Sequence, residues 1–546
     1  MFFYLIVFVL SLILTLLFFL YGSHLYYLLF AAKKYLAPPL KDQQDCRPPV
    51  CIHLPIYNEK NVIIKVASAC AAMAESYGKD KVRIMILDDS DDDTIQVVDR
   101  IVKEYQQQKI KIDVVRRRNR DEYKAGALQA ALEKTSEEYI AIFDADFIPP
   151  VDFLERTVPY LAVNDHLGII QSRWSFTNKD FNAITRAVSH IIDVHFLIEQ
   201  PGRYAKGCFQ NFNGSGGLLR KKAILEAGGW QGDTLAEDLD LSYRIQLCGY
   251  HVLYLQEVLC PGEIPANVPS YKLQQSRWAN GSLKVALKIL PGLLRDRRFS
   301  WRKRLLAFLH LTGYMIQPLM VFSFVLAVLA AFGGFNSYQF SSLMSISADV
   351  GGMGASLART IISLQYAVWA ILTPFIVLCA LAPWVAIITT LNTQKLSILR
   401  NLGDLLVLLL ISLGISLSIL NGAFRALFTR RRLDWTRTPK LADLQENPYS
   451  RRGRYFLPLD PIWIGEFLFA VVGLVACWAA LVKGNISGLL ILLPFTISYI
   501  FVLSASILQR RNERGRDACP RDSRPVQAED QDLRGIQIKT SPRDNR

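Results

Sequence analysis

Hydrophobic residues follow two contrasting patterns along the chain. Short apolar runs that end in polar residues occupy much of the first half, whereas long apolar stretches stand at the N-terminus and throughout the second half. Runs of about four to eight apolar residues are typical of buried strands, and stretches of about 20 can cross a bilayer. The pattern predicts a water-soluble α/β domain between membrane segments.

Residues 2–20 are almost entirely apolar, and the apolar character continues weakly until Lys33 and Lys34. This length is sufficient for a transmembrane helix. A cleaved signal peptide is the alternative, but no basic residue precedes the apolar run and no clear cleavage site follows it. We expect residues 1–32 to form a retained N-terminal transmembrane helix.

The region 45–290 alternates short apolar runs with amphipathic segments. Strands are expected at 50–56, 82–88, 110–115, 139–144 and 167–172. Alternating strands and helices predict a mixed, mostly parallel sheet covered by helices. Ligands of such sheets bind beyond the carboxyl ends of the strands, so polar side chains that follow the strands are candidates for a binding site.

Five apolar stretches follow, at about 305–332, 360–391, 404–424, 461–482 and 487–508. The loop between the third and fourth stretches and the segment after the fifth are rich in Arg, and such segments favour the cytoplasmic side. Five crossings would place both on the side of the membrane opposite the soluble domain. We therefore expect about four crossings within 291–508, with 404–424 interfacial or re-entrant. A true fifth crossing with an exported basic loop is the alternative.

The composition agrees with a membrane protein that carries a soluble domain, because 51% of its 546 residues are hydrophobic and 20% are charged. Much of the net charge of +14 lies in blocks beside apolar stretches, which favours a topological role over nucleic-acid binding. The nine cysteines form no CxxC pair, so neither a disulfide scaffold nor a zinc site is expected. The polar residues 509–546 are expected to be a disordered cytoplasmic tail.

Two acidic pairs follow predicted strands. Asp88 and Asp89 end the second strand, where carboxylates can hydrogen-bond a base or ribose, although capping of the next helix is equally compatible. Asp144 and Asp146 end the fourth strand in the sequence Phe-Asp-Ala-Asp-Phe. Hard oxygen ligands suit Mg²⁺ or Mn²⁺ bridging to a diphosphate, so we expect a divalent cation there.

A third acidic pair and an Arg-Trp segment complete the candidate chemistry. Glu237 and Asp238 begin a segment with helical periodicity, where one carboxylate could act as a general base; acidic residues are also favourable at any helix N-terminus. Gln274, Arg277 and Trp278 precede the membrane region. Arg can hold a phosphate and Trp can stack on a sugar, but both are also frequent at bilayer interfaces.

Taken in order, these residues resemble the D, DxD, ED and QxxRW motifs of processive family 2 glycosyltransferases, the group of cellulose, hyaluronan and chitin synthases. Within this group the chain is most similar to the cellulose-synthase-like A mannan and glucomannan synthases and their bacterial relatives. The segments that carry this similarity are Leu87–Ser90, Tyr123–Leu128, Phe143–Phe147, Arg173–Phe176, Phe212–Gly214 and Glu226–Trp230. The resemblance implies a catalytic domain with the GT-A fold.

The resemblance also implies a role for each motif residue. The implied roles are nucleotide-sugar binding for Asp88, Asp89, Lys124, Asp144, Gln274 and Arg277, metal binding for Asp146 with Asp144, catalysis for Asp238 as the base with Glu237, and acceptor binding for Trp278. Two places depart from the family pattern. Ala236 replaces the usual Thr before the acidic pair, and Ala279–Ser282 differs from the Ser-Cys-Gly sequence of the plant proteins.

The implied function is inverting, metal-dependent transfer of a hexose from GDP-mannose or UDP-glucose to a growing β-linked polysaccharide, with translocation through the membrane bundle. A non-processive transferase acting on a membrane lipid is the main alternative, and a transporter or scaffold that only binds sugar nucleotide is a third. The catalytic domain would face the cytoplasm at a bacterial inner membrane or a Golgi membrane. Donor sugar, product length and oligomeric state stay open.

Overall fold

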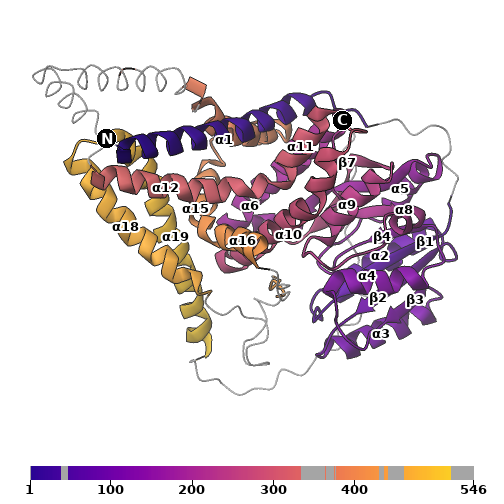
Figure 1. Cartoon of the computed structure of the whole chain (residues 1–546). Coiled ribbons are helices and arrows are strands. Elements are labelled where there is room, and N and C mark those ends of the chain that lie inside the picture. Colours follow the sequence, from indigo (N-terminus) through magenta and orange to yellow (C-terminus); the bar gives the residue numbers. More distant parts are fainter. Residues whose placement is uncertain are drawn as a thin grey trace, which may run out of the picture.

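The computed structural model describes residues 2–37, 47–333, 363, 374–375, 377–429, 436–440 and 460–517. An α/β domain lies beside a group of long helices (Figure 1). The strands gather at one side of the view, and helices α1, α12, α18 and α19 lie at the other. The predicted fold class, a GT-A type α/β domain with a helical membrane bundle, is confirmed.

Seven strands form one sheet in the order β3-β2-β1-β4-β6-β5-β7. Their bounds are Val50–Ile56 for β1, Val82–Asp88 for β2, Lys111–Val115 for β3, Tyr139–Ile142 for β4, Leu167–Phe176 for β5, Gly217–Arg220 for β6 and His251–Gly262 for β7. Strand β6 runs antiparallel to β4 and β5, and the other neighbours are parallel. All five predicted strands are present, but β4 ends at Ile142, so Asp144 lies in the loop beyond it.

Helices cover both faces of the sheet. One face packs against α2 (Ile63–Tyr77), α3 (Thr94–Gln107) and α5 (Phe153–Ala162), and the other against α4 (Tyr123–Lys134), α8 (Lys221–Glu226) and α9 (Glu237–Leu247). Every residue of β1 except one is buried, as expected for a parallel strand with helices on both sides.

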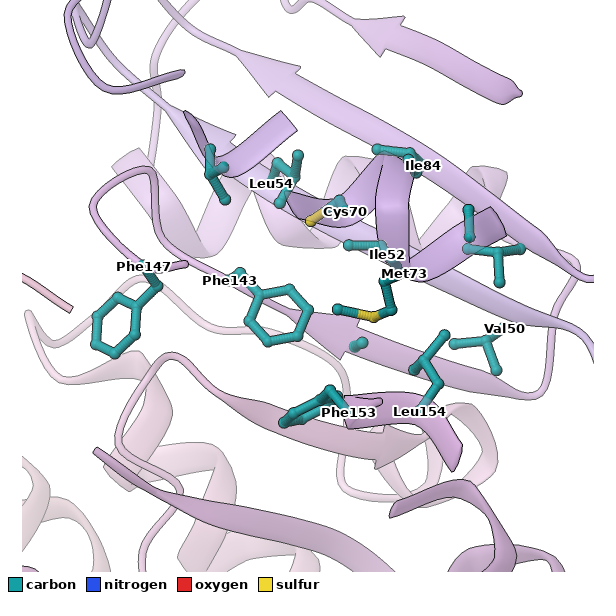
Figure 2. Packing of buried hydrophobic residues seen from close by; sticks show 14 of the residues in the cluster. Val50, Ile52, Leu54, Cys70, Met73, Ile84, Phe143, Phe147, Phe153 and Leu154 are labelled. Carbon is teal, nitrogen blue, oxygen red and sulfur yellow. The ribbon is translucent and has the colours of Figure 1, made fainter. Parts of the chain in front are cut away.

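Alternate residues of β1 point into one core. Val50, Ile52 and Leu54 are fully buried and lie near Met73 of α2 and Phe143 after β4 (Figure 2). Burying a side chain such as Ile52 stabilises the fold by roughly 1.5–3 kcal/mol. This core fixes the ends of β1 and β4, which carry polar residues to the same edge of the sheet.

The N-terminal helix α1 (Phe2–Ala32) lies along one edge of a group of further helical segments (Figure 1). They are α10 (Val268–Arg295), α11 (Trp301–Leu311), α12 (Ile316–Gly333), α15 (Leu402–Gly414), α16 (Ser416–Phe428), α18 (Ile462–Val482) and α19 (Ile486–Asp517). Five described segments are long and apolar enough to cross a membrane: Val9–Ala32, Gly313–Phe332, Leu402–Phe428, Ile462–Val482 and Gly488–Gln509. The shorter apolar helix Val377–Thr393 lies within the stretch predicted at 360–391.

Two predicted boundaries in this region have different outcomes. The stretch 404–424 forms α15 and α16, which together qualify as a span by length and composition; its interfacial or re-entrant position, like the number of crossings, stays a prediction. Helix α19 continues to Asp517, past the predicted start of the tail, because Gln, Arg and Glu favour helix. The remaining tail, 518–546, lies outside the described residues.

Candidate active site

A cavity of about 1400 Å³ lies between the carboxyl ends of the strands and the helical bundle. Its wall contains the ends of β1, β5 and β7 and side chains of α1, α10 and α12. The candidate residues that line it are Asp89, Lys124, Asp144, Asp146, Glu237, Asp238, Gln274, Arg277 and Trp278. The fold thus brings motifs from distant parts of the chain to one place.

Asp88 is the candidate residue that does not line this cavity. It is the last residue of β2, and its side chain is fully buried. Asp88 Oδ2 accepts a hydrogen bond from Arg116 Nε at 2.9 Å, and Oδ1 accepts one from Ser90 N at 3.1 Å. The next residue, Asp89, pairs with Arg117 and does line the cavity. Asp88 therefore fixes the loop, and Asp89 faces the ligand space.

Lys124 lies among carboxylates near the start of α4. Its Nζ is 2.6 Å from Asp144 Oδ1 and 3.9 Å from Glu237 Oε1, and it donates to Gly214 O at 2.9 Å. Burial lowers the pKa of Lys124, but the charges of Asp144 and Glu237 outweigh this and raise it above its usual value. Lys124 is therefore a persistent cation at the centre of the site.

The acidic pair Glu237 and Asp238 occupies the first turn of α9. Burial raises the pKa of Glu237 to about 7, although the charge of Lys124 opposes this. Burial likewise raises the pKa of Asp238, again against the charge of Lys124. A carboxylate whose pKa is raised accepts a proton more readily than an ordinary one, which suits a general base.

Asp144 and Asp146 have different partners. Asp144 pairs with Lys124, whereas Asp146 Oδ2 lies 2.6 Å from Lys440 Nζ. Among the described residues there is no group of three or more His, Cys, Asp or Glu that could hold a metal ion. Two carboxylates together with diphosphate oxygens are nevertheless a usual ligand set for Mg²⁺ at nucleotide sites. The pair therefore fits a cation that is bound jointly with a nucleotide.

Two family models match the chain. The model described as glycosyl transferase family 2 matches residues 51–219, and that described as glycosyl transferase family group 2 matches residues 139–388. Residues 51–388 are therefore similar to family 2 glycosyltransferases. The resemblance inferred from its motifs is confirmed.

The chain is also similar to plant enzymes. It is 37% identical over 281 residues to glucomannan 4-beta-mannosyltransferase 9 of Arabidopsis thaliana, covering 50% of the chain and 52% of that protein. It is 36% identical over 289 residues to probable glucomannan 4-beta-mannosyltransferase 4 of Oryza sativa subsp. japonica, covering 52% of each. The chain spans about half the length of these relatives.

A solved structure also resembles this chain. It is a mannosyltransferase from Pyrobaculum calidifontis in complex with GDP-Man and Mn²⁺, which matches with a TM-score of 0.44 and 21% identity. The match covers 69% of this chain and 99% of the other.

The segment 436–440 contributes residues that the motifs did not reveal. Lys440 pairs with Asp146, and Arg437 Nη2 lies 2.7 Å from Glu59 Oε2 beyond β1. Arg277 donates to the carbonyl oxygen of Thr436 at 2.7 Å and to Thr438 Oγ1 at 3.0 Å. Sequence reasoning used this basic loop only as a topology signal.

Two further lining residues lie near Asp89. The guanidinium carbon of Arg120 is 3.3 Å from the ring centroid of Tyr57, and both residues line the cavity. Such cation–π contacts are favourable in partly buried places. Arg120 and Tyr57 form a paired cationic and aromatic surface near Asp89, which no spacing in the sequence indicated.

Helix α10 connects the site with the bundle. Asn267 caps its start by accepting from Ser270 N, and Gln274, Arg277 and Trp278 lie on one face because they are three and four residues apart. On another side, a Cβ at Gly422 of α16 would lie 2.3 Å from Ser276 O. Asn280, where the chain departs from the plant pattern, donates to Gly422 O at 3.1 Å. The two helices therefore touch backbone to backbone.

A buried ion pair also ties α10 to α18. Lys272 Nζ lies 2.5 Å from Glu466 Oε1, and their side chains are 5% and 0% exposed. A buried charge without its partner is strongly unfavourable, so the two helices depend on this pairing.

Proposed function

We propose that the chain transfers a hexose from GDP-mannose or UDP-glucose to a growing β-linked polysaccharide. The main support for this proposal is that Asp238, Lys124, Asp144 and Asp146 all line one cavity. The similarity to glucomannan 4-beta-mannosyltransferases supports a mannosyl donor and a polysaccharide acceptor.

In this proposal Asp238 accepts the proton of the acceptor hydroxyl. The oxygen then bonds to the anomeric carbon of the donor while the bond to the nucleotide diphosphate breaks. Lys124 lies close to the leaving diphosphate and offsets its charge. A single displacement inverts the anomeric carbon, so an α-linked donor gives a β-linked product.

Mg²⁺ or Mn²⁺ would be held by Asp144 and Asp146 and would neutralise the diphosphate. The donor set fits this group, because both residues supply carboxylate oxygens at the sheet edge. Lys440 contacts Asp146 at 2.6 Å, so cation binding requires this contact to open or to be shared.

The cavity continues into the bundle, which supports translocation. None of the described lining residues in 7–18, 316–330, 379–387, 408–419 and 485–495 is charged. Hydrogen-bonding side chains among them are Ser11, Thr15, Gln317, Ser323, Ser412 and Asn485. An uncharged wall with hydroxyl and amide groups suits a neutral glycan. The apolar side chains between them, such as Leu14 and Leu326, favour the alternative acceptor, a membrane lipid.

The same proposal places the chain in a membrane with several crossings and its catalytic domain in the cytoplasm, where nucleotide sugars are available. The five apolar segments support the membrane location. Arg-rich loops support the orientation.

The experiment is a donor panel with product analysis. Purified protein in lipid nanodiscs is incubated with radiolabelled GDP-mannose or UDP-glucose and Mn²⁺. We expect a long polymer that β-mannanase or β-glucanase digests, and loss of product when EDTA removes the cation. Radiolabel in the organic phase without polymer would replace the polysaccharide by a lipid acceptor.

Asp238→Asn tests the assigned base. Transfer should fall by about 10²–10⁴-fold, since general base catalysis typically contributes this much, while nucleotide binding stays unchanged. The matched control is Asp180→Asn, an exposed position outside the cavity. Retained transfer in Asp238→Asn would contradict the role of Asp238, and absence of transfer in the wild type with both donors would favour a scaffold.

A further inference from the structure

A π-helical turn interrupts the helix that leads from the sheet to α1. Helix α6 (Ala183–Val194) passes through the π turn His195–Glu199 into α7 (Gln200–Ala205). Such turns occur frequently at functional sites, because the inserted residue changes the direction of the side chains around it. Here both ends of the turn, His195 and Glu199, line the cavity.

Two donors hold one oxygen of Glu199. His195 Nδ1 lies 2.9 Å from Glu199 Oε2, and Arg203 Nη2 lies 3.0 Å from the same atom. Burial raises the pKa of Glu199, but the charge of Arg203 and the hydrogen bond from His195 outweigh it and hold the pKa well below its usual value. Glu199 is therefore a fixed carboxylate at neutral pH.

The other oxygen, Oε1, receives neither of these bonds. The side chain of Glu199 is 30% exposed and the residue lines the cavity, so Oε1 is the oxygen that remains available to a ligand. Arg203 also lines the cavity, but its side chain is only 5% exposed and its guanidinium group is hydrogen-bonded to Glu199 Oε2. An ionised oxygen with fixed geometry forms strong hydrogen bonds to hydroxyl groups.

Glu199 is linked to the catalytic centre through His195. His195 Nε2 lies 3.2 Å from Asn213 Oδ1. Asn213 precedes Gly214, which is so close to the base that a Cβ there would lie 2.8 Å from Asp238 Oδ2. The contact between His195 and Asn213 thus links the turn that carries Glu199 to the loop beside Asp238.

On its other side the turn touches the membrane helix α1. A Cβ at Gly202 would lie 2.5 Å from Leu28 O, so the backbones of α7 and α1 are in contact. His24 of α1 also lines the cavity. Glu199 therefore stands where the cavity passes from the catalytic residues into the uncharged part within the bundle.

We propose that Glu199 is an acceptor subsite: its Oε1 accepts hydrogen bonds from hydroxyl groups of a neutral hexose in the acceptor, next to the sugar that reacts at Asp238. His195 and Arg203 are positioning residues that keep Oε2 engaged and Oε1 in the cavity. The proposal rests on the proposed function, because it takes the acceptor to be a glycan.

The test is Glu199→Gln, which keeps the shape of the side chain and removes its charge. Initial rates are measured with added β-1,4-linked mannohexaose or cellohexaose as acceptor, beside slow hydrolysis of the donor by water. We expect the KM for the oligosaccharide to rise about tenfold or more, as for loss of a charge-assisted hydrogen bond. Donor hydrolysis and nucleotide affinity should remain unchanged.

The matched control is Glu226→Gln, a surface carboxylate that accepts from Tyr250 and lies outside the cavity. His195→Gln should give an intermediate KM, since Glu199 keeps Arg203 but loses one support. The subsite would be overturned if the KM for the oligosaccharide were unchanged in Glu199→Gln. It would also be overturned if donor hydrolysis by water fell by the same factor as transfer to the oligosaccharide. Absence of transfer by the wild type would instead overturn the proposed function.

Discussion

Removal of Lys124 should move the pH dependence of hexose transfer. Lys124 Nζ lies 3.9 Å from Glu237 Oε1, and both side chains are largely buried. At an effective dielectric constant of about 20, unit charges at this distance interact by about 4 kcal/mol, which corresponds to about three pKa units. Lys124→Met removes this attraction, while the burial that already raises the pKa values of Glu237 and Asp238 stays.

The direction of the change follows from the active form of the base. The proposed base, Asp238, works as a carboxylate, so activity is lost as the pH falls through its pKa. The charge of Lys124 lowers the pKa of Asp238 as it lowers that of Glu237. Raising that pKa moves the acidic limb of the kcat/KM profile to higher pH, by about one to three units once solvent in the cavity weakens the interaction. Activity lost at neutral pH should partly return at alkaline pH.

The assay measures initial rates of transfer across the pH range at saturating Mn²⁺, with the melting temperature as a check of folding. Lys124→Arg is the control, because it keeps the positive charge and should leave the limb in place. If Lys124→Met is folded but its acidic limb stays or moves to lower pH, Lys124 does not set the charge state of the acidic pair.

Two further predictions concern α10. Lys272→Met should lower the free energy of unfolding by about 3–5 kcal/mol, because it leaves Glu466 buried and unpaired; the double variant with Glu466→Gln should recover most of the melting temperature in detergent. Gly422→Ala should lower both transfer activity and stability, because its Cβ would lie 2.3 Å from the backbone oxygen of Ser276. The control Gly403→Ala, which has open space around its Cβ, should match the wild type in both measurements.

The α/β domain could be predicted well because its signals are local. Each strand is a short apolar run, and the loops at the carboxyl ends of parallel strands necessarily share one edge. That is why Asp89, Asp144 and Asp146 could be placed together from the sequence. Asp88 and Asp89 could not be told apart, because β2 is buried along almost its whole length and the sequence does not show which of two adjacent carboxylates lines the cavity.

Contacts between segments that are distant in the chain could not be predicted from the sequence. Lys440 reaches Asp146 across 294 positions of the chain, and Arg437 reaches Glu59 across 378. Neither carries a periodic or spacing signal, because such pairs depend on how the bundle docks on the domain. The proposed role of Glu199 could not be predicted for a similar reason. A π turn has no clear sequence signature, and the residues of α1 that contact the turn lie far away in the sequence.

The contact of α10 with α16 at Gly422 has a mechanical consequence. No layer of side chains separates the two backbones there, so Ser276 and Gly422 are in direct backbone contact. Trp278, one half-turn further along α10, is therefore tied to α16 by a nearby backbone contact. In the proposed function, a glycan that leaves through the bundle would pass a Trp278 whose position relative to α16 is set by this contact.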